Sequence, residues 1–220
     1  MSSGPIRGGM IVDVILIDAV LEASGTADFT GWPVAEPASD RILALSGQMT
    51  PAEVGAAMAV IFRYGDIPTE PISDLHHLLD RHLVEAEALV APGGLRVRDT
   101  TTNAEILPGC CCGLENWREW RNVLYKKDIW LGHDPGTDLE YIVGAVRLRQ
   151  ESYAHSLTSP TQVEIQLDDL PALLATAHLR LQGFLSLVHK WASEATPRAA
   201  DRLVTVLDEN FEINGPLALG

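Results

Sequence analysis

The chain has 220 residues, of which 46 % are hydrophobic, enough to bury a core along most of its length. Its 30 acidic residues outnumber its 16 lysines and arginines, which leaves a formal net charge of -14. Such a surface repels phosphate backbones and anionic membranes, so the composition argues against a nucleic-acid or membrane-surface partner and favours a basic protein partner. No stretch approaches the roughly 18 apolar residues of a membrane span, so we expect a cytoplasmic protein.

The N-terminal part of the chain is predicted to be helical. The apolar run over 10–24 suits either a buried helix or a strand, and we predict a helix. Thr50, Pro51 and Glu53 form the pattern of a capping box with proline in the first helical turn, which predicts a helix that begins here. The other helices predicted in this part of the chain lie at 40–45 and 73–90.

After Gly94 the hydrophobic period changes from that of a helix to that of a strand. Alternating residues at 95–98 and 104–107, with polar residues between them, predict a β-hairpin. Further along the chain, the pattern predicts strands at 141–149 and 162–167.

Helices dominate the prediction again at the C-terminal end. Apolar residues recur at three and four along 169–193, which predicts a long helix with one buried face. A short helix over 116–125, capped by Asn116, and a last helix over 197–211 complete the set.

The fold class that follows is α+β, with about six helices packed on a small, mostly antiparallel sheet of about four strands. We expect residues 10–214 to form a single domain, with a disordered leader before it and a frayed tail after it. The leader is predicted at 1–9, the helical part at 10–91, the hairpin and cysteine-rich loop at 92–140, the later strands and helices at 141–214, and the tail at 215–220.

Three consecutive cysteines, Cys110, Cys111 and Cys112, are the most unusual feature of the sequence. Adjacent side chains diverge and the number is odd, so a conventional disulfide framework is not expected. Thiolates are ligands for zinc and for copper(I), and His133 lies close enough along the chain to complete a mixed set of ligands. The spacing is shorter than that of structural zinc motifs, and no second cysteine pair is present.

Two other interpretations of the cysteines stay open. The helix predicted after them would lower a thiol pKa, and His133, oriented by Asp134 or Asp138, would then act with a nucleophilic cysteine. In the second interpretation the thiols have only a structural role and pack as small buried side chains under the hairpin. The usual burial of free cysteine favours this interpretation. His76 and Asp80, which share one face of a predicted helix, are more typical of a solvated helix surface than of a metal site.

Three of the five tryptophans, Trp117, Trp120 and Trp130, follow the cysteines closely. Large aromatic rings anchor helices in a core, and they also dominate the binding energy of protein interfaces. We therefore regard them as core residues first and as partner-binding residues second.

The segment PGCCCGLENWREW, followed by WLGHDP, resembles a group of uncharacterised bacterial proteins. The resemblance covers roughly the middle and C-terminal two thirds of the chain. It implies that this central segment defines the group, and it implies no activity, cofactor or catalytic residue.

The sequence contains no GxGxxG, GxxxxGK[ST] or GxSxG motif, so common nucleotide-binding and hydrolase chemistry have no support. We expect an acidic, non-enzymatic binding protein, such as an immunity or antitoxin-like inhibitor of a basic partner, without a cofactor. One alternative is a zinc-binding, copper-binding or thiol-dependent protein centred on the cysteines. The other is a structural subunit of an assembly.

Overall fold

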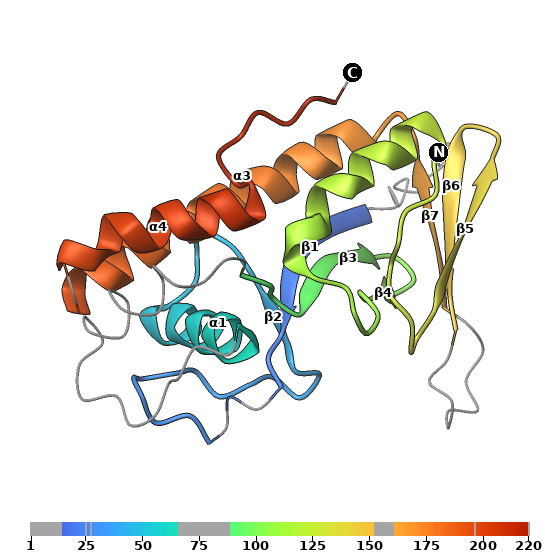
Figure 1. Cartoon of the computed structure of the whole chain (residues 1–220). Coiled ribbons are helices and arrows are strands. Elements are labelled where there is room, and N and C mark those ends of the chain that lie inside the picture. The colour runs from blue at the N-terminus through green and yellow to red at the C-terminus, as the bar shows by residue number, and fades with distance from the viewer. Residues whose placement is uncertain are drawn as a thin grey trace, which may run out of the picture.

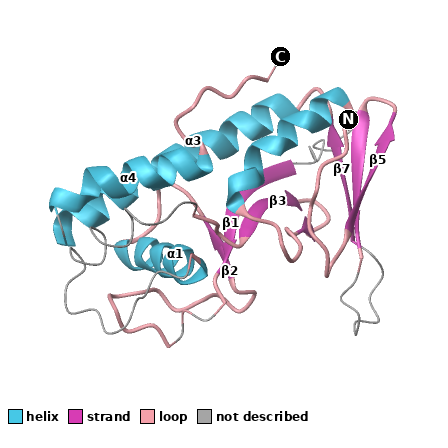
Figure 2. Cartoon of the chain, in the orientation of Figure 1, coloured by secondary structure: helices cyan, strands magenta, loops and turns pink. Residues whose placement is uncertain are grey.

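The computed structural model describes residues 15–24, 26, 28–65, 89–151, 161–195 and 197–219. These residues form a mixed α+β structure with two antiparallel sheets and four helices (Figure 2). The α+β class is therefore confirmed, whereas the prediction of about six helices is not matched in this part of the chain. The helix predicted over 73–90, with His76 and Asp80, lies almost entirely outside the described residues.

The strands are β1 (Ile15–Glu22), β2 (Ile42–Ala44), β3 (Gly93–Asp99), β4 (Ala104–Ile106), β5 (Thr137–Ile142), β6 (Ala145–Gln150) and β7 (Thr161–Gln166). The helices are α1 (Pro51–Tyr64), the 3-10 helix η1 (Leu114–Tyr125), α3 (Leu170–Ala195) and α4 (Pro197–Phe211). One sheet has the order β2-β1-β3-β4 and the other the order β5-β6-β7. In Figure 1 the three-stranded sheet lies at one end of the molecule and α1 toward the other, while α3 and α4 run side by side along its length.

The central strand β1 corrects the helix predicted for the first apolar run. Residues 17–21 are all buried, because β1 is paired on both edges and covered on both faces. The sequence of such a strand is a continuous apolar run and not an alternation of apolar and polar residues. Its hydrophobic periodicity therefore does not distinguish it from a buried helix. The short helix predicted at 40–45 is also wrong, because this segment pairs with β1 as the edge strand β2.

Helix α1 begins where the sequence predicted it. The Thr50 N–H donates to the Glu53 carboxylate at 2.6 Å, and the Glu53 N–H donates to the Thr50 hydroxyl at 3.3 Å, which confirms the capping box. The buried face of the helix includes Val54, Met58 and Phe62.

The predicted hairpin over 95–98 and 104–107 is confirmed as β3 and β4, and the predicted strand over 162–167 is confirmed as β7. The single strand predicted over 141–149 is wrong, because the chain reverses between β5 and β6. Gly144 in this turn has φ +74°, a conformation that glycine adopts without a steric penalty. The apolar residues on either side of the turn therefore belong to two strands and not to one.

Helix α3 confirms the long C-terminal helix, and its buried residues include Leu174, Leu181 and Phe184. It packs against β1, α1 and η1, and so contributes to the main hydrophobic core. Its Arg180 also forms an ion pair with Asp18 of β1, whose side chain is buried within the sheet. Within the described part of the chain, no helix is long and apolar enough to cross a membrane.

Candidate metal centre

The cysteines occupy a tight turn between β4 and η1. The Cys112 N–H donates to the Gly109 carbonyl at 3.2 Å, which makes Cys110 and Cys111 the two central residues of the turn. Cys111 has φ +66°, in the left-handed region that glycine or asparagine normally occupies at this turn position. That conformation costs a residue with a side chain about 1–2 kcal/mol. It accompanies a close approach of the Cys110 and Cys111 sulfur atoms, which lie 3.6 Å apart.

A second loop pairs with this turn and carries His133. The Cys110 N–H donates to the His133 carbonyl at 2.6 Å, and the His133 N–H donates to the Cys110 carbonyl at 3.1 Å. Residues that exchange both hydrogen bonds in this way are direct antiparallel neighbours, and their side chains project to the same side. The backbone alone therefore places the imidazole beside the Cys110 thiol.

Two glycines allow the loops to approach this closely. A Cβ atom on Gly132, which has φ +85°, would lie 2.5 Å from the Gly109 carbonyl carbon. A Cβ atom on Gly109 would lie 2.7 Å from the Pro135 carbonyl oxygen and 2.8 Å from that of His133. All three distances are too short for a real side chain, so the bridge between the two loops requires glycine at both positions.

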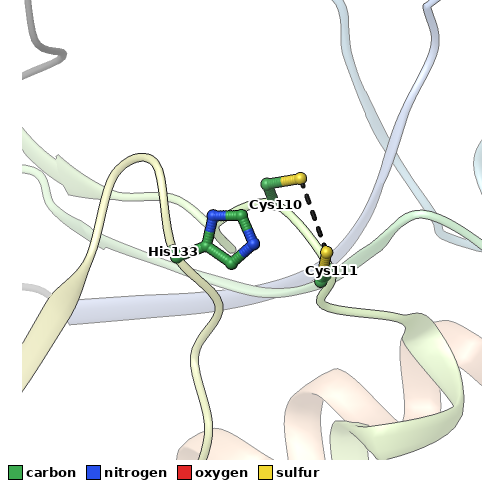
Figure 3. A group of neighbouring side chains, drawn as sticks. All are labelled: Cys110, Cys111 and His133. Carbon is green, nitrogen blue, oxygen red and sulfur yellow. Dashed lines mark hydrogen bonds between the residues drawn. The ribbon is translucent and has the colours of Figure 1, made fainter.

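The orientation of the His133 ring is set by a carboxylate. Its Nδ1 lies 2.9 Å from the Asp134 Oδ2, so the neutral ring donates from Nδ1 and leaves Nε2 as the nitrogen that can act as a ligand. Figure 3 shows the imidazole beside Cys110 and Cys111, with one ring nitrogen on the side of the two sulfur atoms. Metal-binding histidines commonly have such a carboxylate partner on the other nitrogen.

These three side chains have the spacing of a metal site. One ligand atom from each of Cys110, Cys111 and His133 lies within 4.8 Å of the others. A tetrahedral zinc ion about 2.3 Å from each of two sulfurs would hold them about 3.8 Å apart, close to the observed 3.6 Å. A movement of the His133 ring toward the two sulfurs would bring all three donors onto one ion. Three protein donors leave one position of a tetrahedral ion open to water or another ligand.

Cys112, the fourth predicted ligand, is not in this group. Its sulfur contacts the Trp130 carbonyl oxygen at 3.9 Å. Burial raises the pKa of the Cys112 thiol to about 11, so this group is a neutral thiol at physiological pH. The turn therefore separates two exposed thiols from a third that packs against the neighbouring loop.

One sequence-based interpretation of the thiols is wrong. Cys110 and Cys111 are exposed and do not pack as buried side chains under the hairpin, because the left-handed turn directs them outward. The hydrogen bond shared with Cys111 raises the pKa of the Cys110 thiol, which does not support the lowered pKa expected from the following helix. The nucleophilic role of a cysteine stays a prediction.

Hydrogen bonds from several elements hold the turn in place. The N–H groups of Gly93 and Leu114 donate to the carbonyls of Cys112 and Ala91 at 3.1 and 2.8 Å, which ties the end of the turn to the start of β3. On the other side, the buried Gln150 amide exchanges two hydrogen bonds with the backbone of Leu107. Helix η1 begins at Leu114 after Gly113, so the predicted cap by Asn116 is wrong.

The three tryptophans divide into two kinds. Trp117 and Trp120 belong to the hydrophobic core, and the Trp117 indole N–H donates to the Phe211 carbonyl at 2.8 Å. Trp130 is 58 % exposed, and its ring centroid lies 6.4 Å from that of His133. Of the three, Trp130 is therefore the one that is exposed, and it lies beside the cluster.

A pocket of about 450 Å³ opens beside the cysteines, and the sequence did not indicate it. Its lining includes all three cysteines, Asp134, and residues that precede β2 or end β1 and lie far away in the chain. Those distant residues carry charge, and they are Glu22, Asp40 and Arg41. No local motif links them to the cysteines, because only the pairing of β2 with β1 and of β1 with β3 brings them to this side of the sheet.

No protein-family model matches the chain, and neither curated proteins nor solved structures contain a match to it. The chemical interpretation of the site therefore depends on its geometry alone.

Proposed function

We propose that this protein binds a single zinc or copper(I) ion through Cys110, Cys111 and His133. The observation that carries the proposal is that the three ligand atoms lie within 4.8 Å of one another, with the histidine oriented by Asp134. Two thiolates and one imidazole form a donor set that suits both ions. The bound ion would favour the thiolate form of both cysteines and replace the hydrogen bond that they now share.

The open position of the ion supports a role beyond a structural one. Structural zinc sites are closed by four protein ligands, whereas a site with three keeps a position for water or a substrate. Both exposed cysteines also line the pocket of about 450 Å³, so a molecule in that pocket would lie next to the ion. We infer that the ion exchanges or binds an external ligand and does not merely stabilise the fold.

Elemental analysis of the reduced full-length protein, purified without chelator, tests the proposal and identifies the ion. We expect about one equivalent of metal per chain, lost in Cys110→Ser and in His133→Ala. Cys112→Ser is the matched control, because it changes a thiol of the same turn that lies outside the ligand group. Metal-free wild-type protein that also takes up neither zinc nor copper(I) on titration would contradict the proposal, as would equal loss of metal in the Cys112 variant.

A basic protein partner is a second candidate function. The formal net charge of -14 would speed association with a cationic surface, and the exposed Trp130 ring supplies an aromatic anchor next to the cluster. A pull-down from lysate at low salt, repeated at high salt and with Trp130→Ala, tests it. We expect to recover a basic protein, and less of it at high salt and with Trp130→Ala. Recovery that is insensitive to both changes would contradict a basic partner bound through Trp130.

A further inference from the structure

The two outward-facing thiols of the turn are already close to each other. The Cys110 and Cys111 sulfurs lie 3.6 Å apart, and both side chains are exposed. Side chains of adjacent residues normally diverge, and the left-handed Cys111 is where the turn departs from ordinary backbone conformation. The approach is therefore a property of this turn and not of a Cys-Cys sequence in general.

A disulfide between adjacent residues would form here under strain. Successive Cα atoms lie about 3.8 Å apart across a trans peptide bond, whereas disulfide-linked residues usually have Cα atoms about 4.4–6.8 Å apart. Strained and exposed disulfides are the ones that reduce easily and serve regulatory or catalytic roles. Closure at this turn would accordingly be reversible.

From this geometry we propose that Cys110 and Cys111 are a redox pair, oxidised by small-molecule disulfides, whose closure releases the bound metal ion. The formation of the disulfide depends only on the two thiols, whereas the release of metal rests on the proposed function. Oxidation removes both thiolates from the donor set and leaves His133 as the remaining ligand of the three. A bound ion would, in turn, protect the thiols from oxidation.

The chemistry is an ordinary thiol–disulfide exchange in two steps. One thiol passes its proton to a base such as the His133 imidazole, and its sulfur attacks oxidised glutathione, expelling one glutathione thiolate. The neighbouring thiol passes its proton to the expelled glutathione thiolate, and its sulfur then attacks the protein sulfur of this mixed disulfide. This expels the second glutathione thiolate, which takes up the first proton. In total, two protein thiols lose two protons and two electrons, and one oxidised glutathione becomes two reduced molecules. The adjoining pocket of about 450 Å³ gives the oxidant a way to both sulfurs.

Mass spectrometry and thiol titration under denaturing conditions test the pair directly. The reduced full-length protein, with and without one equivalent of zinc, is treated with oxidised glutathione and quenched with acid. We expect the three thiols to fall to one, with the mass of two hydrogen atoms lost and peptide mapping that places the link between Cys110 and Cys111. Excess dithiothreitol restores all three, and prior addition of zinc slows the reaction.

Two variants separate this pair from general thiol reactivity. Cys112→Ser should still form the disulfide and still release zinc to a chromophoric chelator. Cys111→Ser has lost one member of the pair, so its reaction should stop at a glutathione adduct on Cys110. Wild-type protein that ends as glutathione adducts, or that forms its internal bond through Cys112, would overturn the proposal.

The same experiment distinguishes failure of the redox pair from failure of the metal site. If the reduced protein takes up no zinc but closes the disulfide, the proposed function fails together with metal release, and the redox pair stands. If it takes up zinc and its thiols resist oxidised glutathione even when zinc is absent, the redox pair fails and the metal site stands. Disulfide closure with zinc retained would contradict the release of metal.

Discussion

Two clusters of polar side chains in this protein differ in burial and in how far their members are already paired with one another. In the Asp18 cluster (Asp18, Arg96, Arg98 and Arg180), three guanidinium groups surround one carboxylate that is only 3 % exposed. In the Cys–His cluster (Cys110, Cys111 and His133), three side chains that could hold a metal ion lie at the surface and face one another.

The difference lies in what each cluster leaves unsatisfied. The carboxylate of Asp18 already accepts from several arginine N–H groups, so the cluster joins β1, β3 and α3 and offers no donor atoms to a cation. The thiols of the Cys–His cluster share one weak hydrogen bond, and a soft cation would be a stronger partner for them. Buried charge with an internal partner indicates a structural role here, whereas the convergence of exposed donors is the basis on which we propose a binding role.

Removing the carboxylate from the buried cluster should have the largest effect on stability. Asp18→Asn leaves Arg96 buried with less compensation, and we expect the free energy of unfolding to fall by about 3 kcal/mol. We choose the lower end of the range observed for broken buried ion pairs, because Arg98 and Arg180 keep contact with water. Urea denaturation measures the loss, and metal uptake by the folded fraction should be unchanged. A loss below about 0.5 kcal/mol, typical of a surface pair, would remove the contrast between the clusters.

The Asp134 carboxylate, which contacts the Cys–His cluster, should affect metal binding and not stability. Asp134→Asn keeps a residue that tolerates the left-handed backbone at this position and an oxygen that can still accept from His133, but it removes the charge. We expect about a tenfold loss of metal affinity, or about 1.4 kcal/mol, with little change in the stability of the metal-free protein. Competition with a chromophoric chelator measures the affinity. Unchanged affinity would show that Asp134 does not orient the ligand.

Cys111 should show a conflict between stability and binding. Cys111→Gly relieves the left-handed conformation but adds flexibility to the unfolded chain, so we expect a net gain of about 0.5–1 kcal/mol in the metal-free protein. The same change removes a ligand and should abolish stoichiometric metal binding. Cys111→Ala is the matched control, since it removes the ligand and keeps the strained backbone. Thermal denaturation of both metal-free variants measures the difference in stability. A glycine variant no more stable than the alanine variant would argue against strain at this residue.

The smallest expected effect is the pH dependence caused by Cys112. Burial raises the pKa of its thiol from the ordinary value of 9.0 to about 11, so the folded state holds this proton more tightly than the unfolded state. Its contribution to stability is therefore complete below pH 9 and is lost as the pH rises through 11. Between pH 9 and pH 11, we expect the free energy of unfolding to fall less in metal-free Cys112→Ser than in the metal-free wild type. Urea titrations at each pH measure this difference. Parallel curves would show that the thiol is not buried in solution.

The sequence predicted part of the candidate site for sound physical reasons. Soft ligands that lie within one segment can be recognised as a group, and Cys110, Cys111 and His133 were predicted together. Cys112 could not be separated from its neighbours, because the left-handed Cys111 reverses the turn and this conformation has no sequence signature when glycine is absent. The contributions of Gly109 and Gly132 were also missed, because a close approach of two backbones is visible only when both loops are in place.

The sequence by itself determined the elements whose stability is local. The capping box of Thr50 and Glu53 specified the start of α1, the apolar stripe specified α3, and alternation specified the hairpin of β3 and β4. Only the tertiary structure decided the remainder. The run in β1 became a strand because β2 and β3 pair with its two edges. Asp18 lies beside its three arginines because β3 pairs with β1 and α3 packs against it. The thiols lie beside His133 because two loops share a bridge. Each of these outcomes depends on partners that are distant in the chain, and local periodicity contains no information about them.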